Sequence, residues 1–190
     1  AGDGQHALAT TRFAAPLVLR VVDGLGNPVR DVPVTLTLPA TGAGATVIAA
    51  TTRSDQAGDV VVNLAANAHP GSFTLVAQAD RAAAPTIATL TVDAIPTVAT
   101  ATAPAQAAVD QPVTIAIAIA AEVGTAAGEV EILDAGERVL ATATLTAGAA
   151  RVAVALPAPG VHALRVRYPA QGAYAAAISA PVTVEVIGPD

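Results

Sequence analysis

Short runs in which apolar residues alternate with polar or small ones continue along the whole sequence, and most end at glycine, proline or aspartate. Between Val32 and Leu38, for example, every second residue is Val or Leu. Successive side chains of a β-strand point to opposite faces, so a period of two residues predicts strands with one buried face. Alanine is abundant, but it lacks the spacing of an amphipathic helix. We therefore predict an all-β chain.

The number and spacing of these runs predict two domains. Runs recur about every eight to twelve residues, as in β-sandwiches, and one immunoglobulin-like sandwich needs about 100 residues. A complete series ends at Val92, and a new series begins after Ile95, Pro96 and Thr97. We predict two tandem Greek-key β-sandwiches, residues 1–94 and 95–190. A linker this short, with its proline, is expected to restrict the hinge.

Composition excludes several classes of function. Cysteine is absent, which rules out disulfides, thiolate metal sites and a cysteine nucleophile. The formal net charge is −6 without a basic stripe, which argues against nucleic acid and anionic membranes as partners. The longest apolar run, residues 113–121, is too short to span a membrane. Because the sequence begins Ala-Gly-Asp without a leader, we expect a fragment whose export signal lies elsewhere.

The residues that usually carry catalysis do not form a recognisable group. His6, His69 and His162 lie far apart in the sequence and outside any metal-ligand spacing. No serine stands in a G-x-S-x-G motif, and the glycines form neither G-x-G-x-x-G nor a phosphate-binding loop. We expect no cofactor and no enzymatic activity.

One loop of the first half carries a family resemblance. Residues 23–29 read Asp-Gly-Leu-Gly-Asn-Pro-Val. The glycines tolerate positive φ and Pro28 presets a turn, so the loop is short and rigid. It resembles the D-x-x-G-N-P-V signature of bacterial immunoglobulin-like domains of the invasin and intimin group, which occur in surface proteins.

The second half resembles another bacterial immunoglobulin-like family, the type repeated in tandem in large surface proteins. The resemblance rests on residues 128–169 and 172–186. The usual ending of that family is a Tyr, a Gly-containing turn, a second Tyr and then a Ser with a Val/Thr strand. The corresponding residues here are Tyr168, Gly172, Tyr174, Ser179 and 182–186.

These resemblances imply a non-enzymatic stalk or spacer in an adhesin-like protein that is secreted or lies on the bacterial surface. Neighbouring immunoglobulin-like domains of the same chain are then its partners, and another part of the full chain provides an outer-membrane anchor. Two alternatives stay open: a binding module whose loops contact a host or matrix protein, and an accessory domain of a secreted hydrolase. Interface hot spots favour Trp, Tyr and Arg, so an aromatic content of 2% favours the stalk.

The loops of the first half hold the candidates for a metal site. Asp23, Asp55 and Asp80 lie in loops that an immunoglobulin-like sandwich gathers at one end, and calcium binds carboxylate oxygens from several loops. The competing interpretation is a solvated loop end, because Asp bonds its own backbone in turns and arginines lie in or beside the same loops.

Two tyrosines and a set of charges complete the candidates, all in the second half. Tyr168 and Tyr174 are expected to pack at the end of that domain, with a small contact surface as the alternative. Arg165 and Arg167 are expected to lie next to a strand that carries Glu129 and Glu131, with Glu185 flanking them on the other side. We interpret these charges as setting strand register and not as a ligand site.

Overall fold

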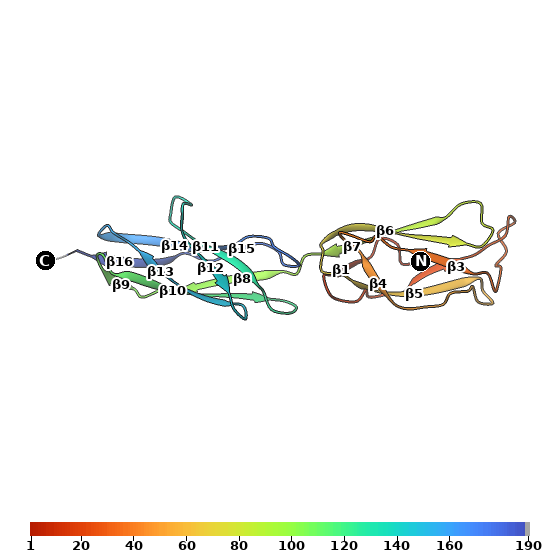
Figure 1. The fold of residues 1–190 in the computed structure, drawn as a ribbon, viewed down its shortest axis with the longest axis horizontal. Coiled ribbons are helices and arrows are strands. Elements are labelled where there is room, and N and C mark those ends of the chain that lie inside the picture. Colours follow the sequence, from red (N-terminus) through yellow and green to blue (C-terminus); the bar gives the residue numbers. More distant parts are fainter. Residues whose placement is uncertain (189–190) are drawn as a thin grey trace. The chain divides into compact units, whose positions relative to one another are not determined.

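The computed structural model describes residues 1–188, and all its regular elements are β-strands. Within this range no helix is long and apolar enough to cross a membrane. The chain divides into two compact units, unit 1 (Ala1–Ala94) and unit 2, which begins at Ile95 (Figure 1). The predicted domain end at Asp190 lies outside the described residues. The prediction of an all-β chain with two sandwiches is confirmed.

Unit 1 consists of two sheets, one in the order β1-β7-β6-β3 and the other in the order β2-β5-β4. Strand β1 is parallel to β7, and the other pairs of this unit are antiparallel. Its strands, all in the described range, are β1 (His6–Leu8), β2 (Leu17–Arg20), β3 (Val34–Thr37), β4 (Ala45–Ala50), β5 (Asp59–Ala66), β6 (Gly71–Ala79) and β7 (Thr86–Asp93).

The core of unit 1 follows the period of two residues. Val60, Val62 and Leu64 on β5 are buried, while the residues between them are more exposed. Across the core, Phe13 packs edge-to-face on Phe73, with ring centroids 6.2 Å apart. Each fully buried aliphatic or aromatic side chain of this kind contributes about 1.5–3 kcal/mol to the free energy of folding.

Unit 2 has the same kind of layout with a wider sheet. One sheet has the order β13-β10-β8, and the other has the order β12-β11-β14-β16-β9, with β15 added to β14. Strands β9 and β16 are parallel. Between residues 95 and 188 the strands are β8 (Thr97–Thr102), β9 (Gln106–Ala108), β10 (Pro112–Ala121), β11 (Gly128–Leu133), β12 (Val139–Leu145), β13 (Ala149–Ala155), β14 (Gly160–Tyr168), β15 (Ala177–Ile178) and β16 (Val182–Ile187).

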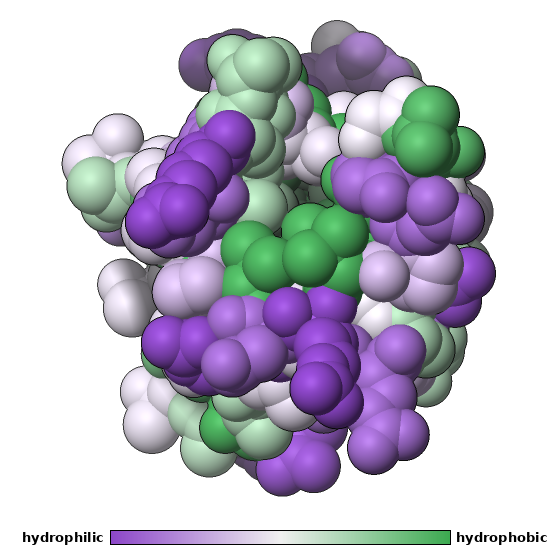
Figure 2. All heavy atoms as spheres, turned by 90° about the vertical axis from the view of Figure 1, so that its right-hand side faces the viewer, coloured by the Kyte–Doolittle hydropathy of each residue, from purple (hydrophilic) through white to green (hydrophobic). Residues whose placement is uncertain are grey.

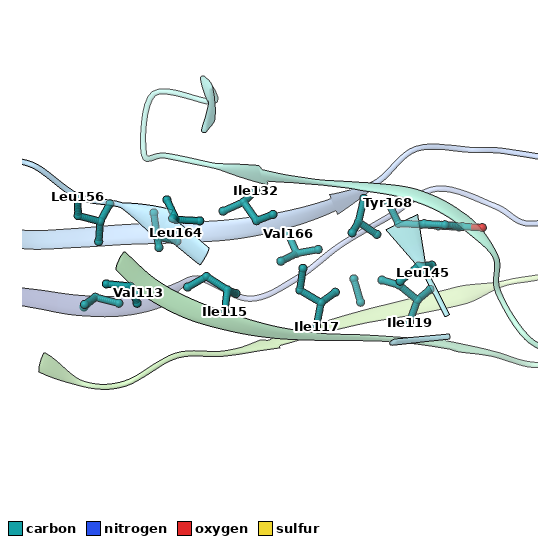
Figure 3. Packing of buried hydrophobic residues seen from close by; sticks show 14 of the residues in the cluster. Val113, Ile115, Ile117, Ile119, Ile132, Leu145, Leu156, Leu164, Val166 and Tyr168 are labelled. Carbon is teal, nitrogen blue, oxygen red and sulfur yellow. The ribbon is translucent and has the colours of Figure 1, made fainter. Parts of the chain in front are cut away.

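The core of unit 2 is almost entirely aliphatic. Ile115 and Ile117 on β10 lie between the two sheets and face Ile132 and Val166 of the opposite sheet (Figure 3). Tyr168 is the one ring among the fully buried residues of this core in the described range. These strands therefore bury one face, as the period of two residues predicts.

The charges on the wider sheet agree in part with expectation. Glu131 on β11 lies directly opposite Arg167 on β14, and Arg167 Nε is 2.6 Å from Glu131 Oε2. Within residues 1–188, Arg165 forms no ion pair. The expectation for Glu185 is wrong, because it pairs farther along β14 and accepts a hydrogen bond from Gln106 Nε2. Of the charge pairs expected across these strands, the Glu131–Arg167 ion pair is therefore the one that forms in the described residues. It contributes about 0.2–1 kcal/mol to stability.

Candidate functional site

Asp23 closes the loop Asp23–Asn27 with its own side chain. Its Oδ1 accepts hydrogen bonds from the N–H groups of Leu25 and Asn27, both at 2.9 Å. Its Oδ2 accepts a third from the Asn27 side-chain amide at 3.1 Å. The Asn27 amide, together with the backbone N–H groups, stabilises the carboxylate and lowers the pKa of Asp23. The loop is therefore held in one shape by a negatively charged side chain.

The loop of Asp55 has the same construction. Asp55 Oδ1 accepts hydrogen bonds from the N–H groups of Ala57 and Asp59, at 2.8 and 2.9 Å. A third copy occurs in unit 2, where Asp134 Oδ1 accepts from Gly136 and Arg138, both at 2.9 Å. The Asp-closed loop is thus a recurring structural unit.

The fourth residue of each loop has a left-handed backbone. Gly26 and Gly58 have φ of 88° and 77°, and Glu137 takes the same place with φ of 61°. Glycine adopts this conformation without a steric penalty, whereas a residue with a Cβ does not. The third loop was not predicted from the sequence because it lacks this glycine, and the remaining signal is an aspartate between two strands.

The loops of Asp23 and Asp55 are joined through the residues beside them. Arg20 forms a two-pronged ion pair with Asp59, with Nε–Oδ1 of 2.7 Å and a second hydrogen bond of 2.9 Å. This hydrogen-bonded guanidinium lowers the pKa of Asp59. The Val21 N–H donates to Gly58 O, and a Cβ on Gly58 would lie 2.6 Å from Val21 O. Glycine is therefore required there for both its φ and its space.

The three calcium candidates do not form one cluster in the described part of the chain. Within residues 1–188, no three Asp, Glu or His side chains lie close enough together to hold a metal ion. The carboxylates of Asp23 and Asp55 accept backbone hydrogen bonds. Asp80 lies beside Arg81, with Oδ2 3.7 Å from Nε. Of these three carboxylates only that of Asp80 lies beside an arginine within the described range, so the choice between a calcium site and solvated loops stays a prediction.

The two tyrosine candidates hold the segment between β10 and β11. The hydroxyl of Tyr168 donates to Ala127 O at 2.8 Å, and the hydroxyl of Tyr174 donates to Thr125 O at 2.7 Å. Tyr168 is fully buried, which raises its pKa and leaves no surface for contact with another protein. The contact hypothesis is therefore wrong for Tyr168. For Tyr174, which is half-buried, a contact role stays a prediction.

Gln171 takes part in the same structure, although it was not among the residues predicted from the sequence. Its side-chain amide donates to Glu129 O at 2.8 Å and accepts from Glu129 N–H at 3.0 Å. Gly128 has φ of 103°, and a Cβ there would overlap the Gln171 amide. Gln171 lies far from this glycine in the sequence, so no local pattern indicates the contact.

Unit 2 fixes its first residue firmly. The Ile95 N–H donates to Ala173 O at 2.8 Å, and the Ala175 N–H donates to Ile95 O at 2.9 Å. The Ile95 side chain is 1% exposed. Residues 171–175 therefore hold both the entry to unit 2 and the segment before β11. We call residues 171–175 the latch.

Comparison with solved structures finds proteins of low sequence identity. The BSP domain of a biofilm associated protein is 19% identical, with 96% of this chain covering 28% of that chain at a TM-score of 0.31. InvD of Yersinia pseudotuberculosis is 15% identical. The match covers 99% of this chain and 58% of that chain, with a TM-score of 0.41. Domains 4–9 of the surface layer protein SbsC are 14% identical. The match covers 98% of this chain and 30% of that chain, with a TM-score of 0.37. This chain thus spans 28% to 58% of the length of these three structures.

Comparison with protein families assigns the second half. No curated protein matches the chain. Residues 98–187 match the family described as bacterial Ig-like domain (group 3), which confirms the resemblance expected for this half. These residues include β8 to β16 almost completely. Unit 2 of this chain is a bacterial immunoglobulin-like domain.

Proposed function

We propose that this chain is a non-enzymatic stalk segment of a bacterial protein that is secreted or displayed on the cell surface. The family of unit 2 supports a bacterial immunoglobulin-like module, and the loop of Asp23 supports the same for unit 1, residues 1–94, as an invasin- or intimin-type domain. Residues 95–190 form the repeat-type domain of this proposal. The partners are further domains of the same type in the longer chain, and the location is extracellular.

The pairing of the terminal strands carries the proposal. In unit 1, β1 near the amino end is the parallel neighbour of β7 at the carboxyl end, in the register His6–Thr91 to Leu8–Asp93. Hydrogen bonds extend the pair at both ends, from Gly4 N–H to Thr89 O and from Ala9 N–H to Asp93 O, both at 2.8 Å. The first and last strands of unit 1 therefore form one ladder.

Unit 2 has a similar parallel pair, but it joins the last strand to the second one, because the first strand, β8, lies in the other sheet beside β10. Strand β9 is parallel to β16, with Gln106 opposite Glu185 and Ala108 opposite Ile187. The Gln106 side chain also donates to Glu185 Oε2 at 2.9 Å, and the Val109 N–H donates to Ile187 O at 3.0 Å.

This geometry suits a segment under tension. Pulling on the two ends of a unit slides parallel neighbouring strands past each other, so their hydrogen bonds are strained together. Antiparallel strands pulled at the open end of a hairpin separate one rung at a time. A stalk that holds a distal part away from a cell needs the first kind of resistance.

Single-molecule pulling on the whole chain tests the proposal. Because cysteine is absent, cysteines added at chosen positions provide unique handles. One variant carries them at both chain ends, and a second carries T74C and T91C, which lie diagonally across β6 and β7, too far apart for a disulfide. The stalk proposal requires a higher unfolding force through the ends than across the β6–β7 pair. An equal or lower force through the ends would remove the support for a stalk.

A binding module that contacts a host or matrix protein is the second candidate, and one observation favours it. Leu25 is 90% exposed at the end of the rigid Asp23–Asn27 loop. An apolar side chain on a loop of fixed shape can be buried by a partner without the cost of ordering the loop. Adhesion of coated beads to matrix proteins distinguishes the two functions. Loss of adhesion in L25S, with no loss in the exposed unit 2 control V161S, would favour the binding module.

A further inference from the structure

Leu25 lies at the tip of a narrow hairpin in unit 1. The Asp23 N–H donates to Asn27 O at 2.9 Å, and the Val29 N–H donates to Val21 O at 3.0 Å. Three hydrogen bonds to the Asp23 carboxylate fix the tip, and Leu25 is 90% exposed. Figure 2 faces the end of unit 1 where the chain turns between β2 and β3, and it shows hydrophobic side chains there among hydrophilic ones. Unit 1 therefore presents an apolar side chain whose position is fixed before any contact forms.

Unit 2 has a hollow on the outer face of its wider sheet. The loop between β11 and β12 stands out from this sheet (Figure 1), and the hollow lies between that loop and β14. Leu133, Ile178 and Pro181 provide apolar walls, and Ile178 is 51% exposed. The volume of the hollow is about 260 Å³. A single water needs about 10–15 Å³, so the hollow has ample room for an aliphatic side chain.

Two charged side chains of the hollow have no counter-charge. Arg165 and Glu137 both line it and are exposed, and among residues 1–188 neither forms an ion pair. The third charged residue of the lining, Asp134, accepts two backbone hydrogen bonds in its own loop. Glu137 also keeps a φ of 61° where the Asp-closed loops of unit 1 have glycine. Strain of this kind is often kept where a side chain serves a function.

The hairpin of Leu25 carries the complementary charges. The Asp23 Oδ2 accepts one hydrogen bond, so the carboxylate has acceptor positions left. Arg30, at the base of the hairpin, is exposed and forms no ion pair in the part of the chain that the structure describes. A contact that seats Leu25 in the hollow brings an anion to Arg165 and a cation to Glu137. Such matched charges favour one partner over others.

We propose that the hairpin of Leu25 in one copy of this chain inserts into the hollow of unit 2 in a second copy. The apolar and the charged halves of the contact are both present on this chain, so a second copy supplies all that the hollow needs. Because the two surfaces differ, each copy can offer its hairpin to one neighbour and its hollow to another, and association continues into rows. The proposal goes beyond the stalk function and does not depend on it, because association needs no tension.

Sedimentation equilibrium of the whole chain over a concentration series tests the contact. L25S removes the apolar side chain, and I178E puts a negative charge in the wall of the hollow, where it repels Asp23. V98S is the matched control, since Val98 is 62% exposed on β8 in the other sheet of unit 2. The contact is small, so we expect the native chain and V98S to associate with a dissociation constant of about 0.1–1 mM. L25S and I178E should each weaken association at least about tenfold.

A mixture of the two variants tests whether the contact joins different surfaces. L25S keeps its hollow and I178E keeps its hairpin, so the mixture is expected to form pairs with one copy of each variant and nothing larger. A native chain that stays monomeric over the whole series would overturn the proposal, and so would association that L25S leaves intact. A mixture without pairs, under conditions in which the native chain associates, would also overturn it.

Discussion

The side-chain amide of Gln171 hydrogen-bonds to both backbone groups of Glu129, as a neighbouring strand would. Gln171 thereby adds a rung at the start of β11, where the segment after Gly124 turns into the sheet. The missing Cβ of Gly128 provides the room for this amide. The contact explains why this glycine is needed, and it predicts a loss of stability when the Gln171 amide is replaced.

Gln171→Glu is expected to destabilise unit 2 by about 1–3 kcal/mol, because the carboxylate cannot donate to Glu129 O and repels it. Gln111→Glu is the control, since Gln111 is exposed in a turn of unit 2. Tyrosine fluorescence during urea unfolding reports on unit 2 alone, because both tyrosines lie there and tryptophan is absent. Equal midpoints for Q171E and the native chain would show that the two hydrogen bonds add nothing to stability.

Glu137→Gly is expected to stabilise unit 2 by about 0.5–1 kcal/mol. A residue with a Cβ pays about 1–2 kcal/mol for a left-handed backbone, and the extra freedom of unfolded glycine offsets only part of this gain. The reverse change, Gly26→Ala, has open space around the new methyl group. It should destabilise unit 1 only because alanine disfavours the positive φ of this position. Urea unfolding measures both. A destabilised E137G would mean that the Glu137 side chain has a role of its own.

Calcium is expected to leave the melting temperature of unit 1 unchanged, because the Asp23 and Asp55 carboxylates already accept backbone hydrogen bonds. Calorimetry of the whole chain with excess calcium and with chelator provides the test. A site present only in the folded state would add about 2.7 kcal/mol at a calcium concentration one hundred times its dissociation constant. A melting temperature that rises with calcium, and no longer rises in D23N, would show that Asp23 binds calcium.

Unit 1 is expected to lose stability as the pH falls below the ordinary carboxyl pKa of 3.8. The folded state lowers the pKa of Asp23 and of Asp59, so their contribution is present above the unfolded pKa and is lost as each carboxylate is protonated in the folded state. D23N should reduce this dependence, because it removes one of the two carboxylates with a lowered pKa. Melting temperatures between pH 7 and pH 3 measure it. An unaltered acid dependence in D23N would contradict the role given to its carboxylate.

The strands were predictable because their pattern is local. The alternation of Val60, Val62 and Leu64 by itself places one face of β5 in a core. The latch at Gln171 was not predictable, because it depends on which strands become neighbours. Glu185 shows the same limit: its strand was correctly expected beside β14, but the register that takes it to Gln106 is set by the whole sheet.

The parallel pairing of first and last strands also determines the order of events when the chain emerges from a ribosome or an export channel. His6 and Asp93, which contact each other in the folded unit, are 87 positions apart. Hairpins such as β6–β7 close short loops early, whereas the β1–β7 ladder waits for the last strand and closes a loop of nearly the whole unit. Unit 1 therefore reaches its finished state in a single late step, and its amino-terminal strand stays unpaired until then.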